Sequence, residues 1–122
     1  MIIPSSKDFI TYEFVYNGIR GLFWEDEKII AITFLHNSTP DTDILNKVMD
    51  ELENYSNDKN KKMYFTNFCS KSFLDIMEER KYNIENIIYE TEERKWQVNI
   101  KFYMPKESNN KSEKCSLELI KK

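Results

Sequence analysis

The candidates for a general base and a nucleophile in this sequence are the single histidine, His36, and Cys69, one of the two cysteines. His36 ends an apolar run that we expect to form a strand, and open sheets often carry functional groups at the carboxyl ends of strands. Cys69 precedes an expected helix, whose N-terminus can lower the pKa of a thiol and so make it a nucleophile. No serine or cysteine stands at a recognisable spacing from His36. We therefore favour a structural or surface role for His36 and a buried apolar role for Cys69, and we assign no catalytic residue.

The segment from Phe34 to Asp43 joins that apolar run to an amphipathic one, which is a common place for a phosphate-binding loop. It contains neither glycine nor lysine nor arginine. Asp41 and Asp43 instead place two carboxylates in the positive field of the expected helix N-terminus, where they would repel a pyrophosphate. The segment therefore predicts no cofactor site.

Metal ligands are sparse along the chain. A structural zinc site needs several His or Cys ligands, and this sequence offers His36, Cys69 and Cys115, well separated from one another. The two cysteines lack CxxC spacing, and no charged and apolar leader precedes the first expected strand, so we expect a reduced, cytoplasmic setting. No apolar run approaches the roughly 18 residues that a membrane span needs, so we expect no membrane partner.

Composition limits the protein class. The 122 residues, 40% of them hydrophobic and 14% aromatic, are sized for one domain with one core. Acidic and basic residues are interspersed and the net charge is -3, so the basic face that nucleic-acid binding requires is missing. The chain is rich in Asn, Ile and Lys and poor in Gly and Pro, a usage typical of AT-rich genomes. This usage suggests a bacterial or mobile-element source.

The first half of the chain predicts a hairpin, a further strand and a helix. Residues 9–16 alternate between apolar and polar positions, and Asn17-Gly18 is a type I′ hairpin signal before a second strand over residues 19–24. The run 29–35 is apolar on both faces, as expected of a central strand that is covered on both sides. Thr39 is the expected N-cap of a helix with Pro40 at its first position. Its apolar stripe consists of Ile44, Leu45, Val48, Met49, Leu52 and Tyr55.

The second half predicts a strand, a helix and a final pair of strands. After a solvated loop from Ser56 to Lys62, residues 63–68 form a strand, and Ser70 caps a helix whose core-facing residues are Phe73, Leu74, Ile76 and Met77. A strand then starts at Ile87, and Trp96–Met104 alternates so that one face is buried and the other, which carries Tyr103, is wet. Cys115, Leu117, Leu119 and Ile120 form either a last short strand or a loose end.

These elements together predict an α+β fold. We expect a single domain over residues 1–105, with a mostly antiparallel sheet of about six strands and two helices packed on it, in the order βββαβαββ. Residues 106–122 are expected to form a polar linker and a short C-terminal segment.

This order resembles the central and C-terminal part of the GNAT-type acyltransferase fold. Residues 62–67 followed by 72–82 are similar to that family's fifth strand and the helix after it, which usually ends in Gly and an aromatic residue. Here Lys81 stands at the glycine position and Tyr82 at the aromatic position. Residues 21–35 are similar to the hairpin that leads into the family's cofactor strand. The resemblance spans residues 9–104, and it implies an acyl-coenzyme A-dependent transferase.

The chain departs from that family where the chemistry is done. The family's Arg/Gln-x-x-Gly-x-Gly/Ala loop, which grips the pyrophosphate of the cofactor, would fall near residues 38–43, where this chain has Ser-Thr-Pro-Asp-Thr-Asp. The tyrosine that often serves as general acid aligns with Met77, and the family's first strand and first helices have no counterpart. The resemblance therefore implies the fold without the cofactor chemistry.

We interpret the chain as a small non-catalytic module that binds another protein, such as an inhibitor or accessory factor. Exposed aromatic residues supply contact area, and acidic clusters can compete for a basic partner, although solvated helix faces and turns look the same. The interface candidates are Trp24, Glu25, Asp26, Glu27 and Tyr103. Trp24 and Tyr103 could equally be core residues.

Two alternatives remain open. One is a divergent acyltransferase that holds acyl-coenzyme A at the junction of residues 35–43. The other is a homo-oligomer, such as a dimer, that pairs the edge strand 10–16 or 96–104 across a twofold axis.

Overall fold

The computed structural model of the chain describes residues 4, 6–38, 41–66, 70–106 and 117–122. Thr39, Pro40, Cys69 and Cys115, which figure in the sequence predictions, lie outside these residues. The elements are β1 (Ile10–Tyr16), β2 (Ile19–Glu25), β3 (Ile29–Asn37), α1 (Thr42–Lys59), β4 (Lys62–Phe65), α2 (Lys71–Glu79), β5 (Asn83–Glu90), β6 (Lys95–Tyr103) and β7 (Leu119–Lys121).

All the strands belong to one sheet in the order β5-β6-β4-β3-β2-β1-β7. Every neighbouring pair is antiparallel except β3 and β4, which run parallel because α1 forms the crossover between them. The α+β class and the mostly antiparallel sheet are thereby confirmed. A seventh strand arises because β7, near the C-terminus, pairs with β1 through Tyr12–Phe14.

The hairpin between β1 and β2 follows from its turn residues. Asn17 has φ 46° and Gly18 has φ 87°, the positive values that a type I′ turn requires. The turn sets the register so that Phe14 lies opposite Gly21.

Helix α1 has different ends from those predicted. Its N-cap is Asp41, whose carboxylate accepts a hydrogen bond from the backbone N–H of Asp43 at 2.9 Å. The predicted loop from Ser56 is wrong, since α1 continues to Lys59 and ends at Asn60 in the left-handed region. Ser56 is fully buried, and its hydroxyl donates to the carbonyl of Lys61. This hydrogen bond satisfies the buried hydroxyl, so the helix continues past Ser56 although the following residues are polar.

Helix α2 begins after Ser70 and buries Phe73, Ile76 and Met77. Leu74, predicted to face the core, is 38% exposed, because it lies on the flank of this short helix. Lys81 follows the helix with φ 56°, and the N–H of Tyr82 bonds to the carbonyl of Met77. This is the C-terminal motif in which glycine is the usual residue.

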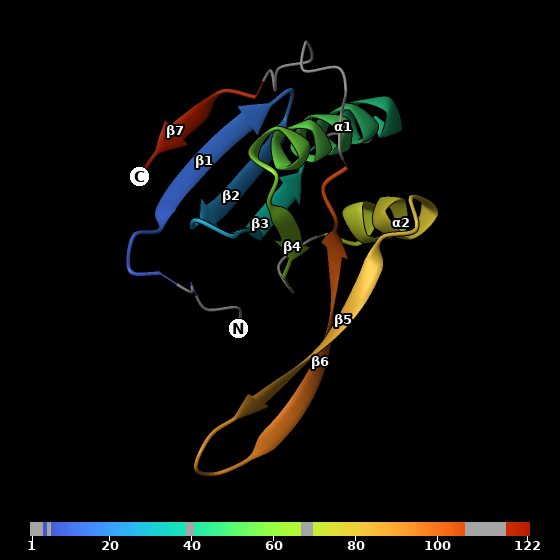
Figure 1. Cartoon of the computed structure of the whole chain (residues 1–122). Coiled ribbons are helices and arrows are strands. Elements are labelled where there is room, and N and C mark those ends of the chain that lie inside the picture. The colour runs from blue at the N-terminus through green and yellow to red at the C-terminus, as the bar shows by residue number, and fades with distance from the viewer. Residues whose placement is uncertain (1–3, 5, 39–40, 67–69, 107–116) are drawn as a thin grey trace.

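Both helices cover the same face of the sheet (Figure 1). The core lies between the helices and this face. Its largest fully buried side chains are Phe14, Ile19, Phe23, Ile30, Ile32, Leu35, Val48, Met49, Leu52, Met63, Phe73 and Met77.

A β-bulge at Thr33 decides which side chains of β3 enter that core. Leu22 pairs with Phe34 and Phe23 pairs with Ile32, so Thr33 has no opposite residue. Leu35 is buried beside Ile32, whereas Phe34 is 41% exposed. The expectation of a strand covered on both sides holds for Ile30, Ala31 and Ile32, which are all fully buried, and is wrong at Phe34 on the helix-free face.

Strands β5 and β6 run away from the rest of the molecule as a two-stranded ribbon (Figure 1). We call residues 86–90 and 95–99 the arm. β5 begins at Asn83, earlier than the predicted Ile87. The one-sided burial predicted for 96–104 is wrong, since Ile100 and Tyr103, which lie on opposite faces of the strand, are both buried while Trp96 is 36% and Met104 50% exposed. The strand passes from the core into an arm over which no other described element packs.

Among the described segments, neither helix has the length and apolarity needed to cross a membrane.

Candidate functional site

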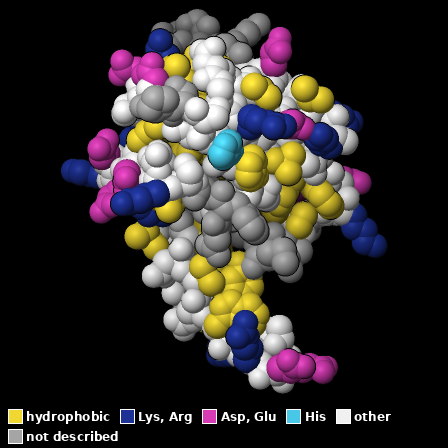
Figure 2. All heavy atoms as spheres, turned by 180° about the vertical axis from the view of Figure 1, so that it is seen from behind, with side chains coloured by type: hydrophobic (Ala, Val, Ile, Leu, Met, Phe, Trp, Pro, Cys, Tyr) yellow, Lys and Arg dark blue, Asp and Glu magenta, His cyan; other side chains and the backbone are white. Residues whose placement is uncertain are grey.

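His36 lies on the helix-free face of the sheet, near the end of β3 (Figure 2). It is exposed, its ring stacks on Phe34 with a centroid distance of 6.1 Å, and its backbone pairs with that of Arg20. Among the described residues, no carboxylate or hydroxyl forms a hydrogen bond with its ring, so a catalytic base with an orienting partner is not assembled there. Also within the described residues, no group of three His, Cys, Asp or Glu side chains is placed to hold a metal ion.

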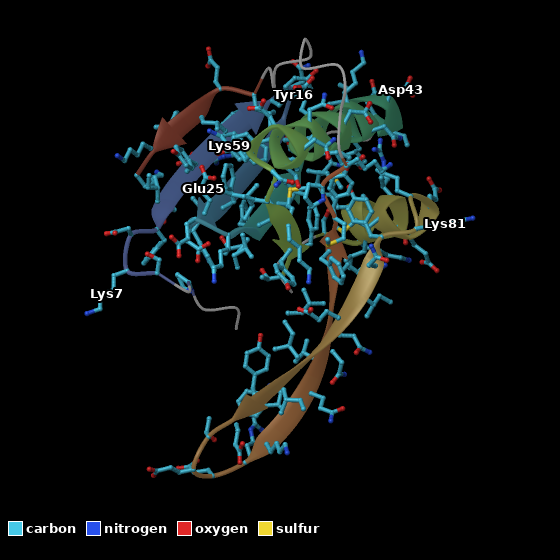
Figure 3. The ribbon with its side chains drawn as sticks, in the orientation of Figure 1. Lys7, Tyr16, Glu25, Asp43, Lys59 and Lys81 are labelled. Carbon is cyan, nitrogen blue, oxygen red and sulfur yellow. The ribbon has the colours of Figure 1, made fainter. Side chains whose placement is uncertain are left out.

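The described ends of the junction between β3 and α1 bind groups of the chain itself. The backbone N–H of Ser38 donates to the carbonyl of Gly18 at 3.1 Å, and the hydroxyl of Ser38 donates to the same carbonyl at 2.5 Å. Asp41 caps α1, and Asp43 adds a second carboxylate at that end of the helix, opposite Lys59 (Figure 3). An anionic ligand would meet two carboxylates at this helix end.

Two of the acidic interface candidates are buried. Glu25 accepts a hydrogen bond from the hydroxyl of Tyr55 and forms an ion pair with Lys61 at 3.0 Å, beneath α1 (Figure 3). Asp26 accepts the backbone N–H groups of Lys28 at 2.8 Å and Ile29 at 2.9 Å, which shapes the turn into β3. These two carboxylates hold the fold together and offer little surface to a partner.

The remaining three candidates divide between surface and core. Glu27 is exposed, and Trp24 is partly buried on the helix-free face, with Phe9 edge-on to its ring at 6.0 Å. Tyr103 is only 6% exposed, and its hydroxyl donates to Asn57 at 2.9 Å. Tyr103 is therefore a core residue and not part of an exposed interface.

A charged cluster joins the two helices. Arg80 binds Glu53 at 2.7 Å and Asp50 at 2.9 Å and also donates to Asn46 of α1. The hydroxyl of Tyr82 donates to Glu53 at 2.6 Å. Burial, and next the Glu53 carboxylate, raise the pKa of Tyr82 far above its usual value, so this phenol stays neutral and serves as a donor.

An open pocket of about 460 Å³ adjoins this cluster. Its walls include Glu53, Tyr82, Phe102, Tyr103 and Pro105. The polar groups of Glu53, Tyr82 and Tyr103 already bind one another or α1, so the pocket presents few unpaired groups to a ligand.

A second charged cluster lies at the base of the arm, on the helix-free face. The ammonium of Lys62 binds Glu85 at 3.0 Å and lies 4.0 Å from the centre of the Phe102 ring, while Tyr64 donates to Glu85 at 2.7 Å. The hydrogen bonds from Tyr64 and Lys62 lower the pKa of the Glu85 carboxyl. This cluster anchors β5 to β4 across β6.

The most extensive unassigned feature is the apolar part of the helix-free face, which we call the sheet back and define as Phe9, Val15, Leu22, Trp24 and Phe34. The strand registers place Val15, Leu22, Trp24 and Phe34 on one face. Leu22 lies opposite Phe34, whereas Val15 lies opposite Arg20, whose guanidinium pairs with Glu13 at 3.6 Å. Val15 is 52%, Phe9 47% and Phe34 41% exposed. Figure 2 shows hydrophobic side chains gathered beside His36 on this face.

Sequence reasoning identified Trp24 but missed Val15 and Phe34. A signal was present, because two helices cannot cover both faces of a wide sheet, while the run 29–35 is apolar on both faces. The bulge at Thr33 and the side on which the helices pack then decide which apolar residues stay exposed. Neither is encoded by neighbouring residues.

No protein-family model, curated protein or solved structure matches this chain, so the site is assigned from its geometry alone.

Proposed function

We propose that this chain is a non-catalytic protein-binding domain, acting as an inhibitor or accessory factor, and that it binds its partner through the sheet back. The observation that supports this function is the exposure of Phe9, Val15 and Phe34 together on one face of the sheet. Exposed apolar side chains gathered on one face of a folded domain are characteristic of interaction sites, and here they surround the ion pair of Glu13 and Arg20.

The shape of the sheet back indicates what kind of partner fits. A sheet normally packs a layer of helices against each apolar face, and the described helices supply only one such layer. An amphipathic helix of another protein would supply the second layer, with Trp24 as an aromatic anchor. Glu13, Arg20 and His36 lie among the apolar residues and would set the orientation of that helix.

Acidic mimicry receives less support than this apolar surface. Glu25 and Asp26 are buried, and Glu53 and Glu85 are in ion pairs with Arg80 and Lys62. The negative charge that remains exposed is spread over the turn at Glu27, both helices and the tip of the arm, and it forms no single acidic face.

The test compares capture of a partner by matched variants. Phe34→Ser combined with Val15→Ser changes the sheet back, whereas Leu74→Ser changes an apolar side chain of similar exposure on α2. We expect one protein to be captured by the wild type and by Leu74→Ser, and to be lost with the double variant while the circular dichroism of all three chains stays the same. Equal capture by the double variant, or a turnover activity that His36→Ala abolishes, would refute the proposal.

A divergent acyltransferase is the second candidate. The order of β1 to β6, α1 and α2, and the left-handed backbone of Lys81 at the position where the resembling family has glycine, support a GNAT-like course of the chain. The carboxylates of Asp41 and Asp43 argue against its cofactor chemistry. A melting temperature that rises saturably with acetyl-coenzyme A would favour this candidate, and an unchanged melting temperature at millimolar ligand would exclude it.

A further inference from the structure

The arm has an unpaired edge within the described chain. β6 pairs with β5 along its length from Lys95 to Phe102, but β4 pairs with β6 only through Lys101, Phe102 and Tyr103. Along residues 95–100, the backbone N–H and C=O groups on the side of β6 away from β5 therefore pair with no described strand. Neither β3 nor β4 extends along the arm (Figure 1).

This edge lacks most of the devices that keep natural strand edges apart. Residues 95–100 contain no proline, and the register with β5 runs from Glu90–Lys95 to Asn83–Phe102 without a bulge. Only Lys95 supplies a charge. A two-stranded ribbon alone is marginally stable in water, and further strands along its edge would stabilise it.

The arm also exposes apolar side chains on both of its faces. Trp96 stacks on Tyr89 at a centroid distance of 5.6 Å, and it remains 36% exposed. Ile88, on the opposite face, is 52% exposed. Pairing along the edge would bring a second set of such side chains beside the first.

We infer that the arm pairs with the arm of a second copy of this chain, with the two β6 edges antiparallel about a twofold axis centred on Gln97. The product is a continuous four-stranded antiparallel ribbon formed by β5 and β6 of each copy.

Register and charge select this arrangement. In an antiparallel pair the opposing residues share a face. A twofold axis normal to the sheet therefore passes between one residue and its own copy in the second chain. Near the middle of the free stretch, that residue is Gln97 or Val98. An axis at Val98 sets Lys95 against Lys101 of the second copy, a like-charge pair, and Lys101 is already opposite Phe65 of β4. An axis at Gln97 sets Lys95 against Asn99 and Trp96 against Val98, with no like charges opposed. The edge is thus complementary to itself.

This dimer is independent of the partner proposed for the sheet back, because it uses backbone groups of β6 and leaves Val15 and Phe34 exposed. Either interaction can fail while the other holds.

Charge substitutions at the axis test the register without disturbing the core, because Gln97 is exposed. We expect the wild-type chain to sediment as a concentration-dependent dimer. Gln97→Lys alone and Gln97→Glu alone each oppose like charges and should raise the dimer Kd by about tenfold or more. An equimolar mixture of the two variants should recover the dimer as a mixed species.

Cross-linking provides the second measurement. In a background of Cys69→Ser and Cys115→Ser, the introduced thiols of Gln97→Cys face each other across the axis, within the Cα separation that a disulfide tolerates. Those of Asn99→Cys lie about 13 Å apart along the strands. We expect mild oxidation to link Gln97→Cys into covalent dimers and to leave Asn99→Cys unlinked.

Several outcomes overturn the inference. They are a chain that stays monomeric at all concentrations, a dimer whose Kd is the same in Gln97→Lys, and a dimer that cross-links through Asn99→Cys in preference to Gln97→Cys. Binding of a strand from a different protein at this edge, with the chain itself monomeric, would overturn it as well.

Discussion

Phe14 packs directly on the backbone of Gly21, its cross-strand partner. A Cβ atom at Gly21 would lie 2.1 Å from the ring carbon Cζ of Phe14, and Phe14 is completely buried. The contact explains why a residue without a side chain stands within β2, where glycine otherwise weakens a strand.

Gly21→Ala should therefore destabilise the protein by about 1–3 kcal/mol, because the ring has no free space to move into. Urea denaturation of the wild type and the variant measures this loss. In a double-mutant cycle with Phe14→Leu, the two substitutions should couple, since the smaller side chain relieves the clash. Strictly additive effects would show that Gly21 is required for another reason.

Glu85 gives the stability a defined pH dependence. Tyr64 and Lys62 lower its pKa below the ordinary value of 4.5, so the unfolded chain takes up this proton more readily than the folded one. The contribution of Glu85 to stability is thus complete above pH 4.5 and is lost as the pH falls through the lower, folded-state pKa. Glu85→Gln should lower the melting temperature at neutral pH, and its difference from the wild type should shrink in acid.

Glu79→Gln, an exposed site on α2, is the control for this titration. Melting curves recorded at neutral pH and about one unit below 4.5 suffice to compare the two variants. A difference between Glu85→Gln and the wild type that grows in acid would contradict the assignment.

At the scale of elements, one side chain ties the two helices together. Arg80 spans from the end of α2 to three residues of α1, namely Asn46, Asp50 and Glu53. A planar guanidinium reaches several acceptors at once, which an ammonium on a flexible chain cannot do.

Arg80→Lys should keep the charge, lose most of these contacts, and lower the free energy of unfolding by about 1–2 kcal/mol. Lys71→Gln, at an exposed position of the same helix, should change it little. Chemical denaturation of both variants provides the measurement. Equal stability of Arg80→Lys and the wild type would mean that apolar packing of Ile76 and Met77 alone fixes α2.

The elements that could be predicted from sequence are those whose causes are local. Asn17 and Gly18 set the first hairpin, and the stripe from Leu45 to Tyr55 places α1 on the sheet. The bulge at Thr33 could not be predicted, because it arises from the pairing of β3 with β2. The buried state of Glu25 likewise depends on Tyr55 and Lys61, which are remote in sequence.

At the scale of the whole molecule, the layers determine which residues form the candidate site. Trp24 was predicted as an interface residue from its type and its position beside an acidic turn, whereas Phe34 and Val15 follow only from knowing that both helices pack on one face. Tyr103 was expected on the solvent-exposed face but is buried, because the C-terminal end of β6 lies in the core while its N-terminal end lies in the arm.

The same architecture distributes stability unevenly. β2 and β3 lie in the middle of the sheet under α1, whereas the arm has one layer and two strands. Backbone amides of residues 86–90 and 95–99 should exchange with solvent faster than those of β2 and β3 in dilute solution, as hydrogen exchange measured by mass spectrometry would show. Concentrating the protein should slow exchange in β6 when arms pair. Uniform protection at every concentration would contradict both expectations.

The two tryptophans lie in different parts of this architecture, and that gives the molecule two separate optical reporters. Trp24 lies in the main part of the sheet beside Phe9, and Trp96 lies on the arm, where it contacts Tyr89 and the guanidinium of Arg94. Replacing either indole with phenylalanine leaves a fluorophore that senses only one region. The emission of Trp24 would then report occupation of the sheet back, and that of Trp96 would report what happens at the arm, so the two events can be followed separately in one cuvette.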